Sequence, residues 1–236
     1  PYPVVSVYSL GGELTSANRR SHHWYRQRER LAQAARMWAA LRGRGDSLLG
    51  VGQEGVVWRE GDWVYKQFYP WAMSAEDAAR IEALVQGDGG PVPGAQWWRA
   101  DGGIWHCRYE WFESAPLPHR VPLEAVKVFL LQLLTCGYVT GNVTRGNFRI
   151  RPNGSLVCID IGADITKFTV SRFLDTAARL YSIGVLGQAD HDMARRDSTL
   201  RPHEAMGALP GFATFFRELV EVAYPHVDAA RYSPVF

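Results

Sequence analysis

The hydrophobic pattern of this chain of 236 residues changes close to residue 116. From residue 47 to about residue 115, apolar and polar residues alternate in short runs separated by glycine-containing turns, which is typical of antiparallel strands. After Pro118 the apolar residues recur at helical spacing in longer runs. Strands early and helices late predict an α+β fold with a β-rich first lobe and a short, α-rich second lobe.

The runs and their flanking turn residues predict the individual elements. Ser74 and Asp77 have the spacing of a capping box, Gly137 ends an apolar helix, and Asn153-Gly154 predicts a hairpin turn between two later strands. We expect strands at 47–50, 56–60, 63–68, 95–100 and 103–112, and helices at 74–87, 123–137, 169–185 and 210–224. The predicted organisation is an N-terminal extension at 1–46, a first lobe at 47–115 and a second lobe at 116–236.

The N-terminal extension is strongly basic. Residues 15–45 contain eight arginines and one acidic residue, Glu29, whereas the whole chain has a net charge of only +2. Trp24, Leu31 and Trp38 recur every seven residues, which predicts an amphipathic helix from residue 15 to about residue 41 that packs through this face. The arginines are then either a solvated face or a contact for a polyanion.

A glycine-rich loop lies between the first two predicted strands. Residues 50–57 read G-V-G-Q-E-G-V-V, and glycines in such a loop let main-chain amides approach phosphates. The match alone is weak, because an ordinary turn has the same residues. Lys66 follows on a predicted core strand, where its charge needs a partner. Phosphates and Glu82 of the next helix are candidates, and an edge lysine that reaches water is the alternative.

A second set of polar residues follows the long apolar helix. Asn142 and Asn147 lie in a loop that reads G-N-V-T-R-G-N-F, and Asp160 ends an apolar strand in I-D-I-G. An amide oxygen and a carboxylate suit Mg²⁺, which takes its other ligands from water and phosphate. The alternative is that these side chains only cap nearby main chain.

Taken together, these segments resemble the protein-kinase superfamily, in particular its small bacterial and aminoglycoside-phosphotransferase-like members. Asn142 and Asn147 are five positions apart, as are the Asp and Asn of their H-G-D-x-x-x-x-N loop, and Asp160 follows thirteen positions later, as the Asp of D-F-G does. The resemblance covers about residues 47–185 and implies a bilobal kinase-like fold that binds ATP and Mg²⁺.

The resemblance also implies a role for each matching residue. Lys66 would pair with the α- and β-phosphates and with Glu82. Arg145 either brings positive charge to the transferred phosphoryl group or is a solvent-exposed loop arginine. The residues that it assigns to the nucleotide are Gly50, Gly52, Gly55 and Val56 over the phosphates and Glu110, Trp111 and Phe112 as a hinge at the adenine. It assigns Asn147 and Asp160 to the metal.

Asn142 departs from the family pattern at the position of the catalytic base. An amide cannot accept a hydroxyl proton as a carboxylate does. Three explanations stay open: an engineered Asp-to-Asn change, a natural pseudokinase that binds nucleotide for regulation, or an enzyme that works without this base. The absence of an A-P-E segment after Asp160 favours a small-molecule or glycan acceptor over a protein substrate. We therefore expect an ATP-dependent phosphotransferase, or as the alternative a nucleotide-binding pseudokinase domain of a larger protein.

Other features place this chain among ordinary globular proteins. No apolar run approaches the roughly 18–20 residues that span a bilayer, and no signal-peptide pattern opens the chain, so we expect a cytoplasmic protein. The chain begins at Pro1 without Met, from which we expect a neighbouring domain. The three cysteines are too far apart for a zinc site and read as reduced core thiols. His22-His23, Asp190, His191 and Asp192 fit solvated polar segments better than metal ligands, and Asp164 and Asp175 are weaker candidates for the cleft and the loop.

Overall fold

The computed structural model describes residues 28, 30–33, 35, 36, 39, 47–82, 90–111, 115–118, 120–185 and 209–223. Most of the predicted N-terminal extension, His22-His23, Phe112, Asp190, His191 and Asp192 lie outside these residues. The chain divides into two compact units, which we describe one at a time. Unit 1 comprises Pro1–Glu82 and Ala95–Trp111, and unit 2 comprises Ala83–Gly94 and Phe112–Phe236.

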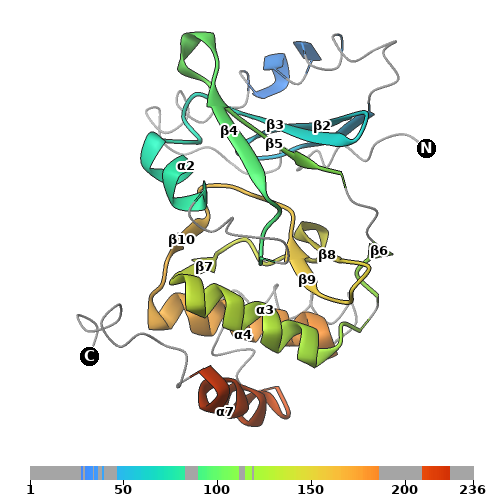
Figure 1. Ribbon diagram of the computed structural model, residues 1–236, viewed down its shortest axis with the longest axis vertical. Coiled ribbons are helices and arrows are strands. Elements are labelled where there is room, and N and C mark those ends of the chain that lie inside the picture. The colour runs from blue at the N-terminus through green and yellow to red at the C-terminus, as the bar shows by residue number, and fades with distance from the viewer. Residues whose placement is uncertain are drawn as a thin grey trace, which may run out of the picture. The chain divides into compact units, whose positions relative to one another are not determined.

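Unit 1 is built on a five-stranded antiparallel sheet with the strand order β1-β2-β3-β5-β4 (Figure 1). The strands are β1 (Ser47–Val51), β2 (Gly55–Glu60), β3 (Trp63–Phe68), β4 (Ala95–Arg99) and β5 (Trp105–Glu110). All five lie where the alternation of apolar and polar residues predicts strands. Along β3, Val64 and Phe68 are buried while Trp63 and Tyr65 are half-buried, so one face of the sheet faces the core of the unit.

One helix, α2 (Ala75–Glu82), packs beside β4 in unit 1. The predicted capping box is present: the Ser74 hydroxyl accepts a hydrogen bond from the Asp77 main-chain N–H at 3.1 Å, and the Ser74 main-chain N–H donates to Asp77 Oδ2 at 3.1 Å. Ala78 and Ile81 on the opposite face are buried. The reciprocal cap therefore fixes where this short helix begins.

The described part of the basic N-terminal segment is helical, but its buried side is not the predicted one. Leu31 is 70% exposed, and Ala35 is exposed as well. Gln33 is buried and Arg30 is half-buried, with its guanidinium donating to the main-chain carbonyl of Gly52 at 2.7 Å. The predicted packing face through Leu31 is therefore wrong for these residues. Polar contacts to the glycine-rich loop position this part of the helix.

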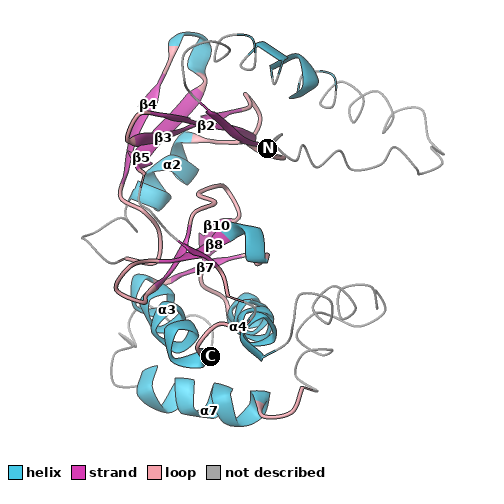
Figure 2. Ribbon diagram, turned by 90° about the vertical axis from the view of Figure 1, so that its right-hand side faces the viewer, coloured by secondary structure: helices cyan, strands magenta, loops and turns pink. Residues whose placement is uncertain are grey.

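Unit 2 is mainly helical. Its helices are α3 (Leu123–Cys136), α4 (Val170–Val185) and α7 (Phe212–Ala223), which contact one another and form two layers beneath the small strands of the unit (Figure 2). The core contains Phe129, Leu133, Leu180 and Phe215, all buried. Gly137 ends α3 with a φ of 76°, and its N–H bonds back to the last turn of the helix. The predicted glycine stop is confirmed, because this left-handed conformation favours glycine.

Short strands carry the polar loops of unit 2. The predicted second hairpin is present as β8 (Phe148–Ile150) and β9 (Leu156–Cys158), with β6 (Ala115–Pro116) added at the edge. A second small sheet pairs β7 (Tyr138–Thr140) with β10 (Ile165–Lys167), which the sequence pattern did not predict. This pairing holds the start of the Asn142 loop beside the segment that follows Asp160.

The division into units also involves the segment before β4. Within unit 2, Cys158 donates its main-chain N–H to the Pro91 carbonyl at 2.9 Å, and Arg151 donates to the Gly90 carbonyl at 2.9 Å. These contacts tie residues 90–91 to β9 and the residues before it.

In the described part of the chain, no helix combines the length and the apolar character needed to cross a membrane.

Candidate functional site

The glycine-rich loop of unit 1 is the tight connection between β1 and β2. The Gly52 N–H donates to the Gly55 carbonyl at 2.8 Å, and the Tyr69 N–H donates to the Glu54 carbonyl at 2.8 Å. Arg30 holds the loop from the other side through the Gly52 carbonyl. The loop is therefore anchored by main-chain contacts at three positions, while Gly50 and Gly52 have no heavy atom within 3.4 Å of an added Cβ.

Gly55 has a different role from the other two glycines. A Cβ at Gly55 would lie 2.1 Å from the Gln67 carbonyl oxygen and 3.0 Å from the Phe68 Cα. The close approach of β2 to β3 therefore requires glycine at this position. Val56 beside it is fully buried in unit 1. The contact of Gly55 and Val56 with phosphates stays a prediction. The packing of β2 against β3, by contrast, requires glycine at position 55.

Lys66 lies on β3 with only 5% of its surface exposed. Its Nζ forms an ion pair at 3.3 Å with Oε2 of Glu54, a residue of the glycine-rich loop. Glu82, the predicted partner, is exposed at the end of α2. The carboxylate within the loop was missed because no sequence spacing rule links positions 54 and 66. A buried ammonium needs a partner of opposite charge, and the Glu54 carboxylate is one.

The Cys107 thiol, next to Lys66 in the sheet, is protonated and unreactive near pH 7. Cys107 faces Lys66 across the β3–β5 pair and is completely buried. Burial raises the pKa of the Cys107 thiol to about 12, and the nearby Lys66 charge only partly opposes this rise. The thiol is therefore neutral near pH 7. Cys158 is buried as well, whereas Cys136 is only half-buried, so the expectation of three core thiols holds for two of them.

The predicted adenine hinge is described only in part. Glu110 is the last residue of β5 and is exposed. Trp111 is 36% exposed, with the Arg59 guanidinium carbon 4.5 Å from the centre of one of its rings. The Trp111 N–H donates to the Asp62 carbonyl at 2.7 Å. A half-open aromatic side chain follows the strand here, and its contact with a base stays a prediction.

In unit 2 the structure brings Asn142, Asn147 and Asp160 into one hydrogen-bonded cluster. Asn142 Nδ2 donates to Asp160 Oδ2 at 3.1 Å, and Asn147 Nδ2 donates to the Asn142 carbonyl at 2.9 Å. The Ile159 N–H donates to the Asn147 carbonyl at 2.8 Å, which ties the loop to the strand end before Asp160. Three residues spread over nineteen positions thus converge as their spacing predicts.

Asp164 belongs to the same cluster. Its Oδ2 accepts a hydrogen bond from the Asn142 main-chain N–H at 3.1 Å, and its carbonyl accepts one from the Gly141 N–H at 3.0 Å. Two carboxylates, Asp160 and Asp164, therefore flank Asn142, one at its side chain and one at its main chain. The β7–β10 pairing, which the sequence pattern did not predict, places Asp164 here.

The donor set at Asn147 and Asp160 fits a magnesium ion. Because Asn147 uses its Nδ2 on the Asn142 carbonyl, its amide oxygen is the atom that remains to bind a cation. An amide oxygen with one carboxylate is a typical protein contribution to Mg²⁺, with water and phosphate oxygens completing the shell. The described residues contain no group of three or more His, Cys, Asp or Glu that would hold a metal alone. A metal here would need the oxygens of a bound phosphate.

Arg145 makes several main-chain contacts within unit 2, and the catalytic role suggested for it stays a prediction. Its guanidinium donates to the main-chain carbonyls of Leu117, Pro118 and Ile183, the first at 3.1 Å and the last at 3.4 Å. The side chain thus ties the short turn 145–147 to the segment before α3 and to the end of α4. A guanidinium that satisfies several carbonyls is directed at the main chain.

Replacing Arg145 with methionine is expected to lower the free energy of unfolding by about 1–3 kcal/mol, because partly buried carbonyls lose a charged donor. Denaturant unfolding followed by fluorescence would measure this loss. Arg120→Met, at an exposed position of the same unit, is the matched control and should stay within about 0.5 kcal/mol of the parent. An Arg145→Met protein of parental stability would contradict the structural role.

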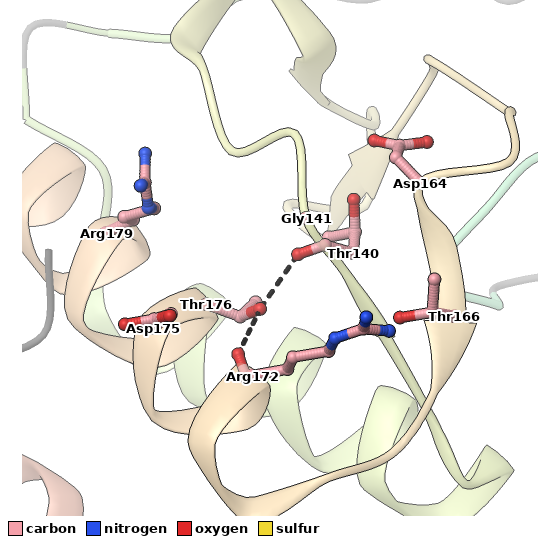
Figure 3. A pocket seen from close by; sticks show the side chains of 8 residues that line it. All are labelled: Thr140, Gly141, Asp164, Thr166, Arg172, Asp175, Thr176 and Arg179. Atoms are coloured by element: carbon pink, nitrogen blue, oxygen red, sulfur yellow. Dashed lines mark hydrogen bonds between the residues drawn. The ribbon is translucent and has the colours of Figure 1, made fainter. Parts of the chain in front are cut away.

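A further contact braces the start of the Asn142 loop. The Thr176 hydroxyl on α4 donates to the Thr140 carbonyl at 2.8 Å and lies 2.9 Å from the Arg172 carbonyl (Figure 3). Asp175, the residue that the sequence suggested for this role, lines the pocket beside it. Thr176 therefore holds the start of the loop, and the bracing role suggested for Asp175 stays a prediction. Helical spacing alone does not separate two adjacent polar residues on a helix of unknown orientation.

Comparisons with known proteins show a distant likeness to solved structures. No family model matches the sequence, and no curated protein is similar to it. A co-crystal structure of WbdD with the kinase inhibitor LY294002 is 14% identical, with a TM-score of 0.43, over 72% of this chain and 44% of that chain. A structure of the bifunctional kinase-methyltransferase WbdD is 14% identical, with a TM-score of 0.40, over 73% and 48%. Monomeric WbdD is 11% identical, with a TM-score of 0.44, over 71% and 44%.

The chain thus spans less than half the length of each of these WbdD chains. The description as a bifunctional kinase-methyltransferase belongs to WbdD.

Proposed function

We propose that this chain is a kinase-like, bilobal phosphotransferase that binds ATP with Mg²⁺ and transfers the γ-phosphoryl group to a hydroxyl of a small molecule or glycan. The observation that carries the proposal is the cluster of Asn142, Asn147 and Asp160, held together by hydrogen bonds of 2.9–3.1 Å. Residues at kinase spacing are expected to converge in this way if they share a metal and a phosphate.

Lys66 in unit 1 supports the same proposal. It is the buried lysine of the third strand, it follows a glycine-rich hairpin, and its ammonium is paired with a carboxylate. In kinases the lysine of the third strand contacts the phosphates while a carboxylate holds it in place. Here Glu54 would hold Lys66, which differs from the family pattern of a carboxylate on the following helix.

The chain's own residues would divide the chemistry as follows. Lys66 binds phosphate oxygens, and Asn147 with Asp160 would hold Mg²⁺, which when bound neutralises phosphate charge. Asn142 keeps Asp160 in place through its amide N–H. Because an amide oxygen is a poor base, Asn142 does not take the hydroxyl proton, and transfer would depend on positioning and charge neutralisation.

A specific observation favours the alternative, a nucleotide-binding pseudokinase domain. The Asn142 amide acts as a donor to Asp160, a contact that an ionised aspartate at this position is unable to make. The cluster is therefore satisfied with asparagine in place. A domain of this kind would bind the nucleotide and regulate a neighbour without turning the nucleotide over.

Nucleotide binding tests both forms of the proposal. We expect Mg-ATP to bind in calorimetry, and Lys66→Met and Asp160→Asn each to weaken it by about 10- to 100-fold, the value of one charge-assisted contact. Lys66→Met should weaken ATP with or without Mg²⁺, whereas Asp160→Asn should chiefly remove the benefit of Mg²⁺. Because the two residues lie in different units, loss in both variants would show that one ligand depends on both.

The controls change the same side-chain types at exposed positions. Lys167→Met and Asp62→Asn should leave the affinity for Mg-ATP within about twofold, since the described structure gives neither side chain a role in the cluster or the loop. Absence of Mg-ATP binding by the folded parent protein would refute the proposal. Binding with turnover supports the phosphotransferase, and binding without turnover on any hydroxyl acceptor supports the pseudokinase.

A further inference from the structure

Unit 2 contains a polar pocket beside the Asn142 loop that the proposed nucleotide and metal contacts do not use. It has a volume of about 290 Å³, close to the lower end of small-ligand sites at about 300 Å³. Its walls are the end of β7, the segment before and within β10, and the first turns of α4 (Figure 3). The lining residues are Thr140, Gly141, Asp164, Thr166, Arg172, Asp175, Thr176 and Arg179.

A buried hydroxyl without a partner is the first indication of a ligand. Thr140 is 1% exposed and lines the pocket, and its Oγ1 has no hydrogen-bond partner in the described part of the chain. Its main-chain carbonyl, by contrast, is satisfied by Thr176. In Figure 3 the Thr140 hydroxyl points to the side of the strand on which Asp164 lies. Buried polar groups are normally paired, so an exception that faces a cavity indicates a ligand or an ordered water.

The pocket also presents the guanidinium group of Arg172. Arg172 and Arg179 both line the pocket, but they are seven residues, about 10 Å, apart along α4. In Figure 3 the Arg172 guanidinium points toward Thr166, whereas that of Arg179 points to another side. Among the described residues, the hydrogen bonds of Arg172 are made by its main chain, with Thr169 and Thr176, and its guanidinium is not among the contacts. Arginine binds phosphate and carboxylate groups through paired N–H donors. An anionic group on the ligand would meet this requirement.

Two carboxylates in the pocket disfavour a simple anion as its ligand. Asp164 and Asp175 line the same pocket and would repel an anion that has no hydrogen-bond donor for them. They accept hydrogen bonds, as do the threonine hydroxyls. The favoured ligand therefore carries an anionic group for Arg172 and several hydroxyl donors for the aspartates. Small phosphorylated or carboxylated polyols have both.

We propose that this pocket binds a small anionic polyol, with the anionic group at Arg172 and a hydroxyl hydrogen-bonded to Thr140 Oγ1. Two pocket residues, Gly141 and Asp164, also contact each other and the Asn142 main chain, so the ligand lies next to the candidate catalytic loop. The further role of acceptor rests on the proposed function; the binding does not.

As an acceptor, the polyol would react in a balanced transfer. One of its hydroxyl oxygens forms a bond to the γ-phosphorus of the nucleotide while the bond from that phosphorus to the β–γ bridging oxygen breaks. The nucleoside diphosphate leaves, and the hydroxyl proton passes late to water, as a loose transition state allows. No oxidant or further reactant is required.

Calorimetry with four probes tests the binding. We expect glucose 6-phosphate or glucuronate to bind the full chain with a dissociation constant of about 1 mM or lower, and glucose and inorganic phosphate to bind at least about tenfold more weakly. The two charged probes distinguish phosphate from carboxylate. Failure of both charged sugars to bind would overturn the proposal. Inorganic phosphate that binds as tightly as the charged sugars would overturn it too, because the pocket would then hold an adventitious ion only.

Two variants locate the site. Arg172→Gln should weaken the charged probe about tenfold or more, whereas Arg120→Gln, at an exposed position of unit 2, should not change it. Thr140→Val removes the unpaired hydroxyl without changing shape, so it should raise the melting temperature and lower probe affinity at the same time; Thr140→Ser should retain affinity. Unchanged affinity in both Arg172→Gln and Thr140→Val would refute the site.

The readouts separate this proposal from the nucleotide proposal. Arg172→Gln should leave Mg-ATP affinity unchanged, because the residue is outside the Asn142, Asn147 and Asp160 contacts. Probe binding without any Mg-ATP binding would support the pocket and refute the proposed function. Mg-ATP binding without probe binding would support the proposed function and refute the pocket. A faster Mg-ATP turnover in the presence of the charged probe would support both.

Discussion

Replacing Asn142 with aspartate is expected to raise phosphoryl transfer by about 10²- to 10⁴-fold, the usual contribution of a general base. The variant puts a carboxylate at the position where the kinase pattern has one, in a loop that Asn147 and Thr176 already hold. Nearly isosteric replacement keeps the loop geometry while it changes the basicity of the oxygen. The gain should therefore appear in kcat.

The same substitution is expected to destabilise the metal-free protein. Asn142 Nδ2 donates to Asp160 Oδ2 at 3.1 Å, and Asn142→Asp replaces this donor with a second carboxylate. Loss of the hydrogen bond and repulsion between like charges should together cost about 1–3 kcal/mol. Mg²⁺ should recover part of the loss, because a divalent cation bound near both carboxylates offsets their repulsion.

Paired turnover and unfolding measurements with and without Mg²⁺ check both effects. Asn153→Asp is the matched control: it makes the same chemical change in an exposed turn, where the Asn153 oxygen already accepts hydrogen bonds from Ser155. Neither turnover nor Mg²⁺-dependent stability should change there. An Asn142→Asp protein that binds Mg-ATP but gains no turnover would favour the pseudokinase over the enzyme.

Local signals predicted most of the secondary structure because each acts over a few residues. The Ser74–Asp77 cap and the left-handed Gly137 both occur where the sequence places them. The cap and the glycine stop are determined by short-range chemistry. The resemblance to kinases assigned Asn147 and Asp160 to one metal, and the structure connects both residues to Asn142 by hydrogen bonds.

Contacts between distant segments were beyond such reasoning. Lys66 pairs with Glu54 in a loop twelve residues away, and Thr176 reaches Thr140 from thirty-six residues away. The three-residue strands of the β7–β10 pair are too short to show alternation. The hydrogen bonds from Arg145 to the carbonyls of Leu117 and Ile183 are a further example, because they join residues 28 and 38 positions apart in the sequence.

Replacing Gly55 with alanine is expected to cost about 3 kcal/mol or more, because its Cβ would lie 2.1 Å from the Gln67 carbonyl oxygen. The atom in the way is main chain, and Gln67 lies in β3, which is paired on both sides. Relief would have to separate β2 from β3 next to Lys66. We therefore expect both unfolding at lower denaturant concentration and weaker nucleotide binding, from one distortion of the hairpin.

Gly50→Ala separates packing from ligand approach at the same loop. An added Cβ at Gly50 meets no atom within 4 Å, so stability should stay within about 0.5 kcal/mol of the parent. If main-chain amides of this loop approach phosphates, the added methyl group should still weaken Mg-ATP. Calorimetry and denaturant unfolding on the two variants check this contrast. Weaker binding with intact stability in Gly50→Ala would identify the loop as a phosphate contact, whereas unchanged binding would leave only Gly55 with an explained role, in packing.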